Sequence, residues 1–242
     1  MPLEEPGMAT WTGSGSKFMV TRSGRCRARA SKARFLLGGL LAVVAMVGST
    51  SAGAAPTTSV RGGFATGPLF AESNREYTTM VATRYQHHNQ ESEVDHTYFY
   101  DCVGFVSYAM GRAAPTAWTT TRDTLKIRTG YVPSPARYVG LFDKINAGGS
   151  LPGWAPIASV ADLQPGDVIA WYYDASATSK PGSASGHSVI IGAPPTTTGP
   201  DAYSVLVYDS TGTPHGPQDT RLTNPANQRN AGGKPTGLGQ GT

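Results

Sequence analysis

The sequence predicts an α+β protein in which helices come first and an antiparallel sheet follows. Two observations lead to this class. Between residues 69 and 148, apolar side chains recur at helical spacing. Between residues 168 and 208, short runs rich in β-formers alternate with loops of Gly, Pro and Ser. Because consecutive strands joined by short loops pair antiparallel, we expect the helices to pack on an antiparallel sheet.

Residues 1–55 have the order of parts found in a secretory signal peptide. A stretch rich in Arg and Lys precedes an apolar run over residues 35–47, and small residues follow from Ser49 to Ala55. We expect cleavage near Ala54 or Ala55. The apolar run is shorter than the roughly 20 residues that span a bilayer, although an uncut membrane anchor is the alternative. The protein is therefore expected to be secreted or cell-wall associated, with no stable membrane insertion after cleavage.

The basic character of the chain belongs to this leader. The whole chain has a formal net charge of +4, but seven of its Lys and Arg residues lie in residues 1–55. Residues 56–242 retain 13 basic and 14 acidic residues, and no basic patch with interleaved aromatic residues occurs among them. Nucleic acid is therefore not an expected partner.

Residues 56–68 are polar and Gly-rich and read as a linker, and residues 69–242 are long enough for one domain with a real core. Within this domain the apolar spacing and the Pro and Gly positions predict three helices. They cover Leu69 to Tyr85, Cys102 to Arg112 with Pro115 at the exit, and Pro135 to Gly148.

Three strands are predicted after the helices. Pro165-Gly166 is a tight-turn signal, and β-rich runs follow it with loops at residues 174–186 and 194–200 between them. The strands cover Val168 to Tyr172, His187 to Gly192 and Tyr203 to Tyr208.

Cys102 is the one cysteine that remains once the leader is removed, since Cys26 lies within the leader. A lone thiol in an exported protein suggests either intermolecular pairing or a reactive group. Cys102 begins a predicted helix, and a helix N-terminus beside an imidazolium lowers the pKa of a cysteine from its usual value of about 8.5. The backbone N–H of Cys102 would form half of an oxyanion hole, and Gly104 would let a substrate backbone approach closely.

A histidine and an aspartate that lie later in the sequence would complete a nucleophilic site with Cys102. His187 begins an apolar strand, where a rigid imidazole would face the helix and act as a base for Cys102. Asp209 ends the next predicted strand and would orient that imidazole, with His215 as the reserve candidate for this role. Asp101 would either orient the start of the helix or repel anionic substrates.

Three blocks resemble the signature motifs of the NlpC/P60 family, in the same order and spacing. They are Asp101-Cys102-Val103-Gly104-Phe105-Val106, Leu163-Gln164-Pro165-Gly166-Asp167-Val168 and Gly186-His187-Ser188-Val189-Ile190-Ile191-Gly192. The resemblance covers roughly residues 85–220. It implies a papain-like fold, with Cys102 as nucleophile and His187 as base, in a family of cysteine peptidases and amidases that usually cut cell-wall peptides.

The resemblance also suggests residues that bind substrate. Tyr85 and His87 match the position where the family places a pocket tyrosine, although a polar surface loop is the alternative for this segment. The C-terminal segment, with its Gly237-Leu238-Gly239-Gln240-Gly241 run, looks like that of a poorly characterised exported branch of the family. In that branch another strand would follow Gly241, so this chain would be truncated and would expose a sheet edge.

The sequence therefore predicts an exported cysteine hydrolase that cleaves an amide bond in peptidoglycan stem peptides or another peptide substrate, with Cys102, His187 and Asp209 as catalytic residues. Two alternatives stay open: acyl transfer like that of transglutaminases, and a non-catalytic surface module. No cofactor is needed. No metal site is expected either, because His87, His88, Asp95 and His96 fit no standard ligand spacing.

Overall fold

The computed structural model describes residues 22–23, 66–148, 151–173, 186–200 and 202–242. The predicted leader lies outside the described residues except for Arg22–Ser23, and so does most of the Ser- and Gly-rich loop before His187. All described residues belong to one compact unit. Among the described residues, no helix has both the length and the apolar character needed to cross a membrane.

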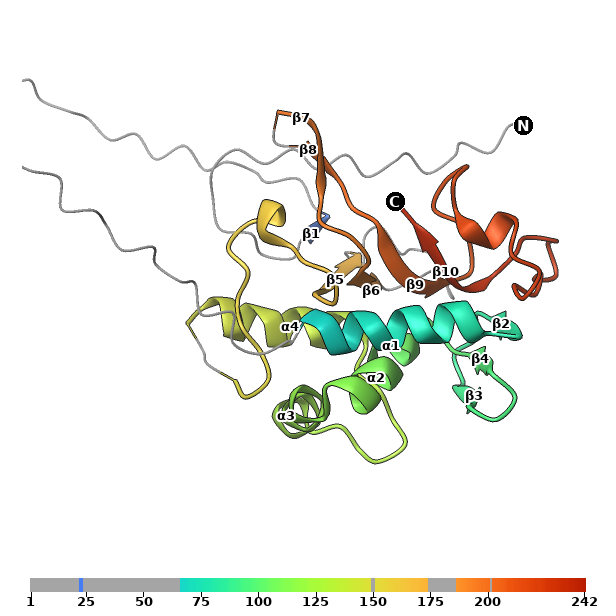
Figure 1. Cartoon of the computed structure of the whole chain (residues 1–242). Coiled ribbons are helices and arrows are strands. Elements are labelled where there is room, and N and C mark those ends of the chain that lie inside the picture. The colour runs from blue at the N-terminus through green and yellow to red at the C-terminus, as the bar shows by residue number, and fades with distance from the viewer. Residues whose placement is uncertain (1–21, 24–65, 149–150, 174–185, 201) are drawn as a thin grey trace, which may run out of the picture. The chain divides into compact units, whose positions relative to one another are not determined.

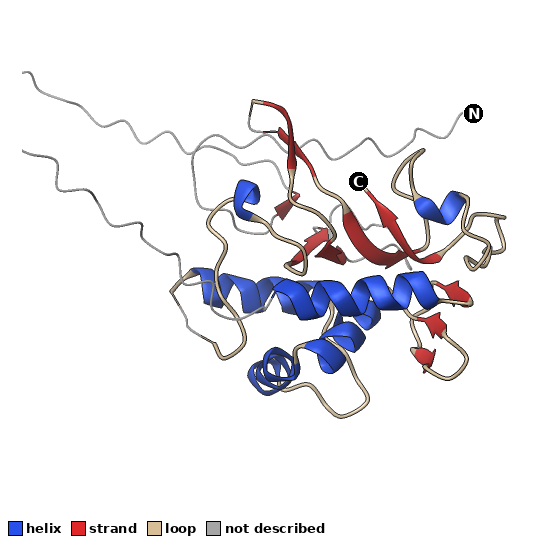
Figure 2. Cartoon of the chain, in the orientation of Figure 1, coloured by secondary structure: helices blue, strands red, loops and turns tan. Residues whose placement is uncertain are grey.

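Four α-helices of the described residues lie on one side of the main sheet (Figures 1 and 2). They are α1 (Thr66–Thr79), α2 (Cys102–Ala113), α3 (Pro115–Leu125) and α4 (Pro135–Asn146). The two helices predicted at Cys102 and Pro135 are confirmed. In α4, the buried face includes Tyr138, Leu141, Phe142 and Ile145, which recur at helical spacing.

Two helix predictions need correction. The helix α1 begins at Thr66, inside the predicted linker, and ends at Thr79, because the following Ala82–Arg84 segment forms strand β2. Pro115 does not simply end α2; it is the first residue of α3, where its missing N–H is tolerated and its fixed φ suits a helix start.

The main sheet confirms the α+β class with antiparallel strands. Its order is β1-β5-β6-β9-β10, and β5 to β10 pair antiparallel along the series. The strands are β5 (Val168–Tyr173), β6 (Gly186–Ile191), β9 (Val207–Thr211) and β10 (Gly237–Gly241). A two-residue strand, β1 (Arg22–Ser23), pairs parallel with β5 at the other edge.

Two smaller sheets contain segments for which other structure was predicted, including the end of the first predicted helix and part of the predicted strand Tyr203 to Tyr208. Strands β2 (Ala82–Arg84), β3 (Gln90–Ser92) and β4 (Thr97–Phe99) form one of them. The predicted strand Tyr203 to Tyr208 is wrong as one element. Its first part belongs to a hairpin of β7 (Thr196–Gly199) and β8 (Ala202–Ser204), and its second part to β9.

The strand β10 was not predicted, and its outer edge is closed by side chains. Leu238 N–H donates to Thr83 Oγ1 at 2.9 Å, and Asn227 Nδ2 donates to the Leu238 carbonyl at 2.9 Å. Gln240 N–H donates to Thr220 Oγ1 at 2.8 Å. The open edge that we expected after a truncated C-terminus is therefore not found along β10.

The helix α2 is the centre of the layer that faces the sheet. It packs against β6 and β9, with α1 and α3 alongside it. Its buried residues run from Cys102 to Ser107 and include Ala109 and Met110. This packing places the N-terminus of α2 beside the strands that contain His187 and Asp209.

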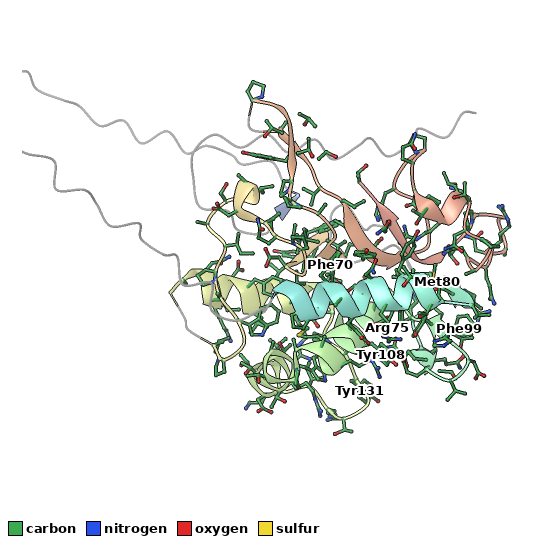
Figure 3. All side chains as sticks on the ribbon, viewed as in Figure 1. Phe70, Arg75, Met80, Phe99, Tyr108 and Tyr131 are labelled. Atoms are coloured by element: carbon green, nitrogen blue, oxygen red, sulfur yellow. The ribbon has the colours of Figure 1, made fainter. Side chains whose placement is uncertain are left out.

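A network of charged residues connects α1 to α2 away from this end. Arg75 of α1 and Tyr108 of α2 are both labelled in Figure 3, and both donate to Glu93 Oε1, at 2.9 Å and 2.6 Å respectively. Glu72 accepts from Arg75 and from Arg112 in the same network. The network joins two helices and a loop without reaching Cys102.

Candidate active site

Cys102 is the first residue of α2 and lies at a capped helix N-terminus. Asp101 is the N-cap residue, with φ −87° and ψ −174°, and its Oδ1 accepts from the Gly104 N–H at 2.8 Å. The predicted role of Asp101 in orienting the helix start is therefore observed. Cys102 and Val103 lie in the first turn of α2, where backbone N–H groups have no acceptor within the helix. The side chain of Cys102 is buried, with 4% of the residue exposed.

His187 is held at the beginning of β6 by close contact with β5. It pairs with Trp171, and the two rings meet edge to face with centroids 5.1 Å apart. The preceding Gly186 leaves no room for a side chain, because a Cβ there would lie 2.3 Å from the Trp171 carbonyl oxygen. The backbone therefore fixes where the imidazole of His187 stands.

Asp209 orients this imidazole through its Nε2 atom. Asp209 Oδ2 lies 2.5 Å from His187 Nε2, and the Asp209 residue is fully buried. Asp209 was expected at the end of a strand; it lies inside β9, where Gly239 of β10 is its partner. Because Nε2 is occupied, Nδ1 is the nitrogen left for Cys102.

The neighbouring Asp209 and Cys102 favour the protonated form of His187. Burial alone would lower the pKa of His187, but side-chain hydrogen bonds to Asp209 and to Cys102, with their charges, raise it to about 10. An imidazolium beside a thiol favours the thiolate, which is the nucleophilic form. The three predicted catalytic residues are thus brought together in the order Cys102, His187, Asp209.

His215 also binds Asp209, so the two candidates for the third residue are both at the site. His215 Nε2 lies 2.8 Å from Asp209 Oδ2, the same oxygen that contacts His187. The two imidazole rings are 5.7 Å apart. The carboxylate stands between the two histidines, and Asp209 rather than His215 contacts His187 directly.

Arg221, which is not among the predicted site residues, binds the other oxygen of Asp209. Arg221 Nη2 donates to Asp209 Oδ1 at 2.5 Å, and Nη1 donates to Asp219 Oδ2 at 2.7 Å. Burial would raise the pKa of the Asp209 carboxyl, but the charges of Arg221 and His215 and the hydrogen bonds from both histidines hold it well below its ordinary value. Asp209 is therefore an ionised acceptor. The sequence signal for Arg221 was its place two residues after Asp219 in a loop that returns to the sheet.

Tyr85, predicted to bind substrate, borders the nucleophile. Burial and then the charges of Cys102, Asp101 and Asp209 raise its pKa, which places the phenol near all three groups. Gly212 packs against the same ring, since a Cβ there would lie 3.6 Å from Tyr85 Cδ1. Tyr85 thus lies between the N-terminus of α2 and the loop after β9.

His87 and Gly104, the other predicted substrate contacts, have different surroundings. His87 Nδ1 lies 3.1 Å from Asp101 Oδ2, while 76% of its side chain is exposed. At Gly104, a Cβ would lie 2.4 Å from Asn89 Oδ1, so the space beside this glycine is filled by Asn89 rather than left for substrate. Asn89 is a neighbour of the helix start that the sequence did not indicate.

Three potential metal ligands meet at this site. Within the described residues, His187, Asp209 and His215 place ligand atoms within 4.8 Å of one another. These atoms already form hydrogen bonds among themselves, and the Arg221 guanidinium on Asp209 opposes the binding of a second cation. The group fits a hydrogen-bonded relay better than a metal centre.

The site therefore consists of a thiol at a helix N-terminus, a charged imidazole and a buried carboxylate anchored by Arg221. Comparisons with models of protein families, with curated proteins and with solved structures found no match to this chain.

Proposed function

We propose that this protein is an exported cysteine hydrolase of the papain-like NlpC/P60 type that cleaves an amide bond in peptidoglycan stem peptides or a related peptide. The observation that carries the proposal is the series Cys102, His187, Asp209, in which the imidazole contacts the thiol on one side and a buried carboxylate on the other. The packing of α2 on an antiparallel sheet supports the papain-like architecture. The peptide substrate and the export rest on the sequence resemblance and on the predicted leader.

The acylation step follows from the positions of the two reactive side chains. The Cys102 thiolate attacks the carbonyl carbon, and the oxyanion is stabilised by the N–H groups at the start of α2. The bond from carbon to nitrogen then breaks, and the proton on His187 Nδ1 passes to the leaving amine. A thioester on Cys102 remains.

Deacylation reverses the roles of the same groups. His187, now neutral, takes a proton from water while the water oxygen attacks the thioester carbon. The bond from carbon to sulfur breaks, the acid leaves and the thiolate–imidazolium pair is restored. Asp209 keeps Nδ1 of His187 directed at Cys102 throughout, because it holds Nε2.

The first test measures how fast Cys102 is alkylated as a function of pH. The full chain with Cys26→Ser leaves Cys102 as its one thiol, and iodoacetamide needs no knowledge of the substrate. We expect fast alkylation that persists to about pH 6, well below the pKa of a free thiol at about 8.5. In His187→Ala the rate should fall at least tenfold at pH 6 and follow the profile of an ordinary thiol.

The matched control is His88→Ala, which removes an exposed histidine from the neighbouring loop. It should behave like the parent protein. A parent protein whose Cys102 reacts only as an ordinary thiol, or with the same profile after His187→Ala, would contradict the proposal and favour a non-catalytic module. Digestion of peptidoglycan fragments with and without an added amine then separates hydrolysis from acyl transfer, because transfer gives an amide product.

A further inference from the structure

Arg221 is the largest fully buried side chain among the described residues. It lies in the single turn η2 (Thr220–Leu222), and no part of its side chain is exposed. Burial of a guanidinium is costly unless acceptors surround it. Here Nε donates to the Gly237 carbonyl at 2.7 Å, Nη1 to Asp219, and Nη2 to both the carbonyl and the side chain of Asp209.

The two carboxylate oxygens of Asp209 have different partners. Oδ1 accepts from Arg221, whereas Oδ2 accepts from His187 and His215. The same guanidinium nitrogen also holds the Asp209 backbone carbonyl. The side chain is therefore fixed relative to its own backbone, and rotation of the carboxylate would break the contact with Arg221.

The glycines of β10 create the space that Arg221 occupies. A Cβ on Gly239 would lie 2.6 Å from Arg221 Cγ, and a Cβ on Gly241 would lie 2.9 Å from Asp219 Oδ2 and from His215 Cβ. Neither glycine has a positive φ, so close contact rather than backbone conformation requires glycine at both positions. Gly239 and Gly241 therefore line a slot that seats Arg221 and the His215 loop against Asp209.

We propose that Arg221 is a positioning residue of the cysteine hydrolase. It acts through Asp209 to hold the His187 imidazole in position beside Cys102. The inference rests on the proposed function. It goes beyond that function because no catalytic step involves Arg221, Gly239 or Gly241. The inference gives these three residues a role in fixing the position of the base, His187. An apolar side chain could fill the slot, but it could not bind Oδ1 and leave Oδ2 to the imidazoles.

The test compares four variants in the Cys26→Ser chain. Arg221→Met keeps the length of the side chain without its donors. Arg221→Lys keeps the charge but loses the fork that binds two acceptors at once. Gly239→Ala presses on Arg221 without removing it, and Gly140→Ala is the matched control, since a Cβ on Gly140 would meet nothing within 4 Å.

The readouts are the pH profile of Cys102 alkylation and the NMR signal of the His187 Nε2 proton. We expect Arg221→Met to lower the alkylation rate at pH 6 at least tenfold and to broaden or shift that signal. Arg221→Lys should recover part of the rate, Gly239→Ala should change it in the same direction as Arg221→Met, and Gly140→Ala should change neither readout. A purely structural Arg221 would lower the melting temperature and leave the pH profile of the folded protein unchanged.

An unchanged profile in folded Arg221→Met overturns the inference. Should Arg221→Met fail to fold, Gly239→Ala and Arg221→Lys decide, and an unchanged profile in both overturns it as well. Failure of the proposed function is distinguishable, because then the parent chain itself lacks alkylation that depends on His187 at low pH.

Discussion

Asp209 and Glu76 are both fully buried carboxylates, yet their surroundings shift their pKa values in opposite directions. For both groups, burial by itself raises the pKa. At Asp209 the charge of Arg221 and two imidazole donors reverse that effect. At Glu76 the strongest compensation is one hydrogen bond from the Tyr100 hydroxyl, at 2.6 Å to Oε2, and Oε1 has no hydrogen-bond partner among the described residues. The presence of an adjacent cation therefore decides which of the two is ionised.

Glu76→Gln should stabilise the fold at pH 8 and have a much smaller effect at pH 4. A carboxyl whose folded pKa lies above its unfolded value contributes stability at low pH, and this contribution is lost as the pH rises through the folded pKa. Each unit of that pKa shift corresponds to about 1.4 kcal/mol at high pH. We therefore expect the free energy of unfolding of Glu76→Gln at pH 8 to exceed that of the parent by at least about 1 kcal/mol. Urea unfolding at the two pH values measures it.

Asp143→Asn is the control for this prediction, because Asp143 is exposed on α4. It should change the free energy of unfolding by less than about 0.5 kcal/mol at either pH. A Glu76→Gln protein that is equally destabilised at pH 4 and pH 8 would show that Glu76 does not carry a raised pKa.

At the scale of single elements, β10 is built from residues that ordinarily disfavour strands. Three of its five residues are glycine, which weakens a strand interior. Its stability comes from its neighbours: β9 pairs with it on one side, and Thr83, Asn227 and Thr220 bind its outward backbone groups on the other. The gain is the slot for Arg221, which any other residue at position 239 would obstruct.

Gly237→Ala and Gly140→Ala should therefore have opposite effects on stability. Gly237 has φ +101°, and a Cβ there would lie 2.5 Å from Thr83 Oγ1. We expect a loss of about 2 kcal/mol or more from strain and contact together. Gly140 lies exposed within α4, where alanine gains about 0.5–1 kcal/mol over glycine. Thermal and urea unfolding of both variants check the signs, and destabilisation by Gly140→Ala would refute the second.

At the scale of the whole described unit, Thr83 connects segments that are far apart in the sequence. Its hydroxyl donates to the Tyr98 carbonyl at 2.7 Å and accepts from the Leu238 N–H at 2.9 Å. Its backbone N–H donates to Ala226, and its carbonyl accepts from Gln228. One buried residue thus joins β2, β4, the segment before β10, and β10 itself.

Thr83→Val keeps the size of the side chain and removes its hydroxyl. The Leu238 N–H would then be buried without an acceptor, which costs about 1–3 kcal/mol. We expect that loss in urea unfolding, together with faster amide exchange at Leu238. Thr119→Val on the exposed side of α3 is the control and should be close to neutral. Unchanged exchange at Leu238 would show that Thr83 does not hold β10.

The elements that the sequence predicts well are those with strong local signals. The helix α4 has Pro135 at its start and a clear apolar face, and the helix at Cys102 has an N-cap residue before it. The strand at Val168 follows a Pro-Gly turn. The missed elements lack such signals: β10 is glycine-rich, and Pro115 suits the start of α3 as well as the end of α2.

By itself, the sequence determined the class of the fold and the chemical partners at its centre, because a thiol at a helix start and a histidine on an apolar strand are local features. The tertiary structure alone decided how the carboxylate of Asp209 is shared, with His187 and His215 on one oxygen and Arg221 on the other. The role inferred for Arg221 depends on contacts between η2, β9 and β10. Such a contact depends on which strands pair and on space left by absent side chains, and no short stretch of sequence records either.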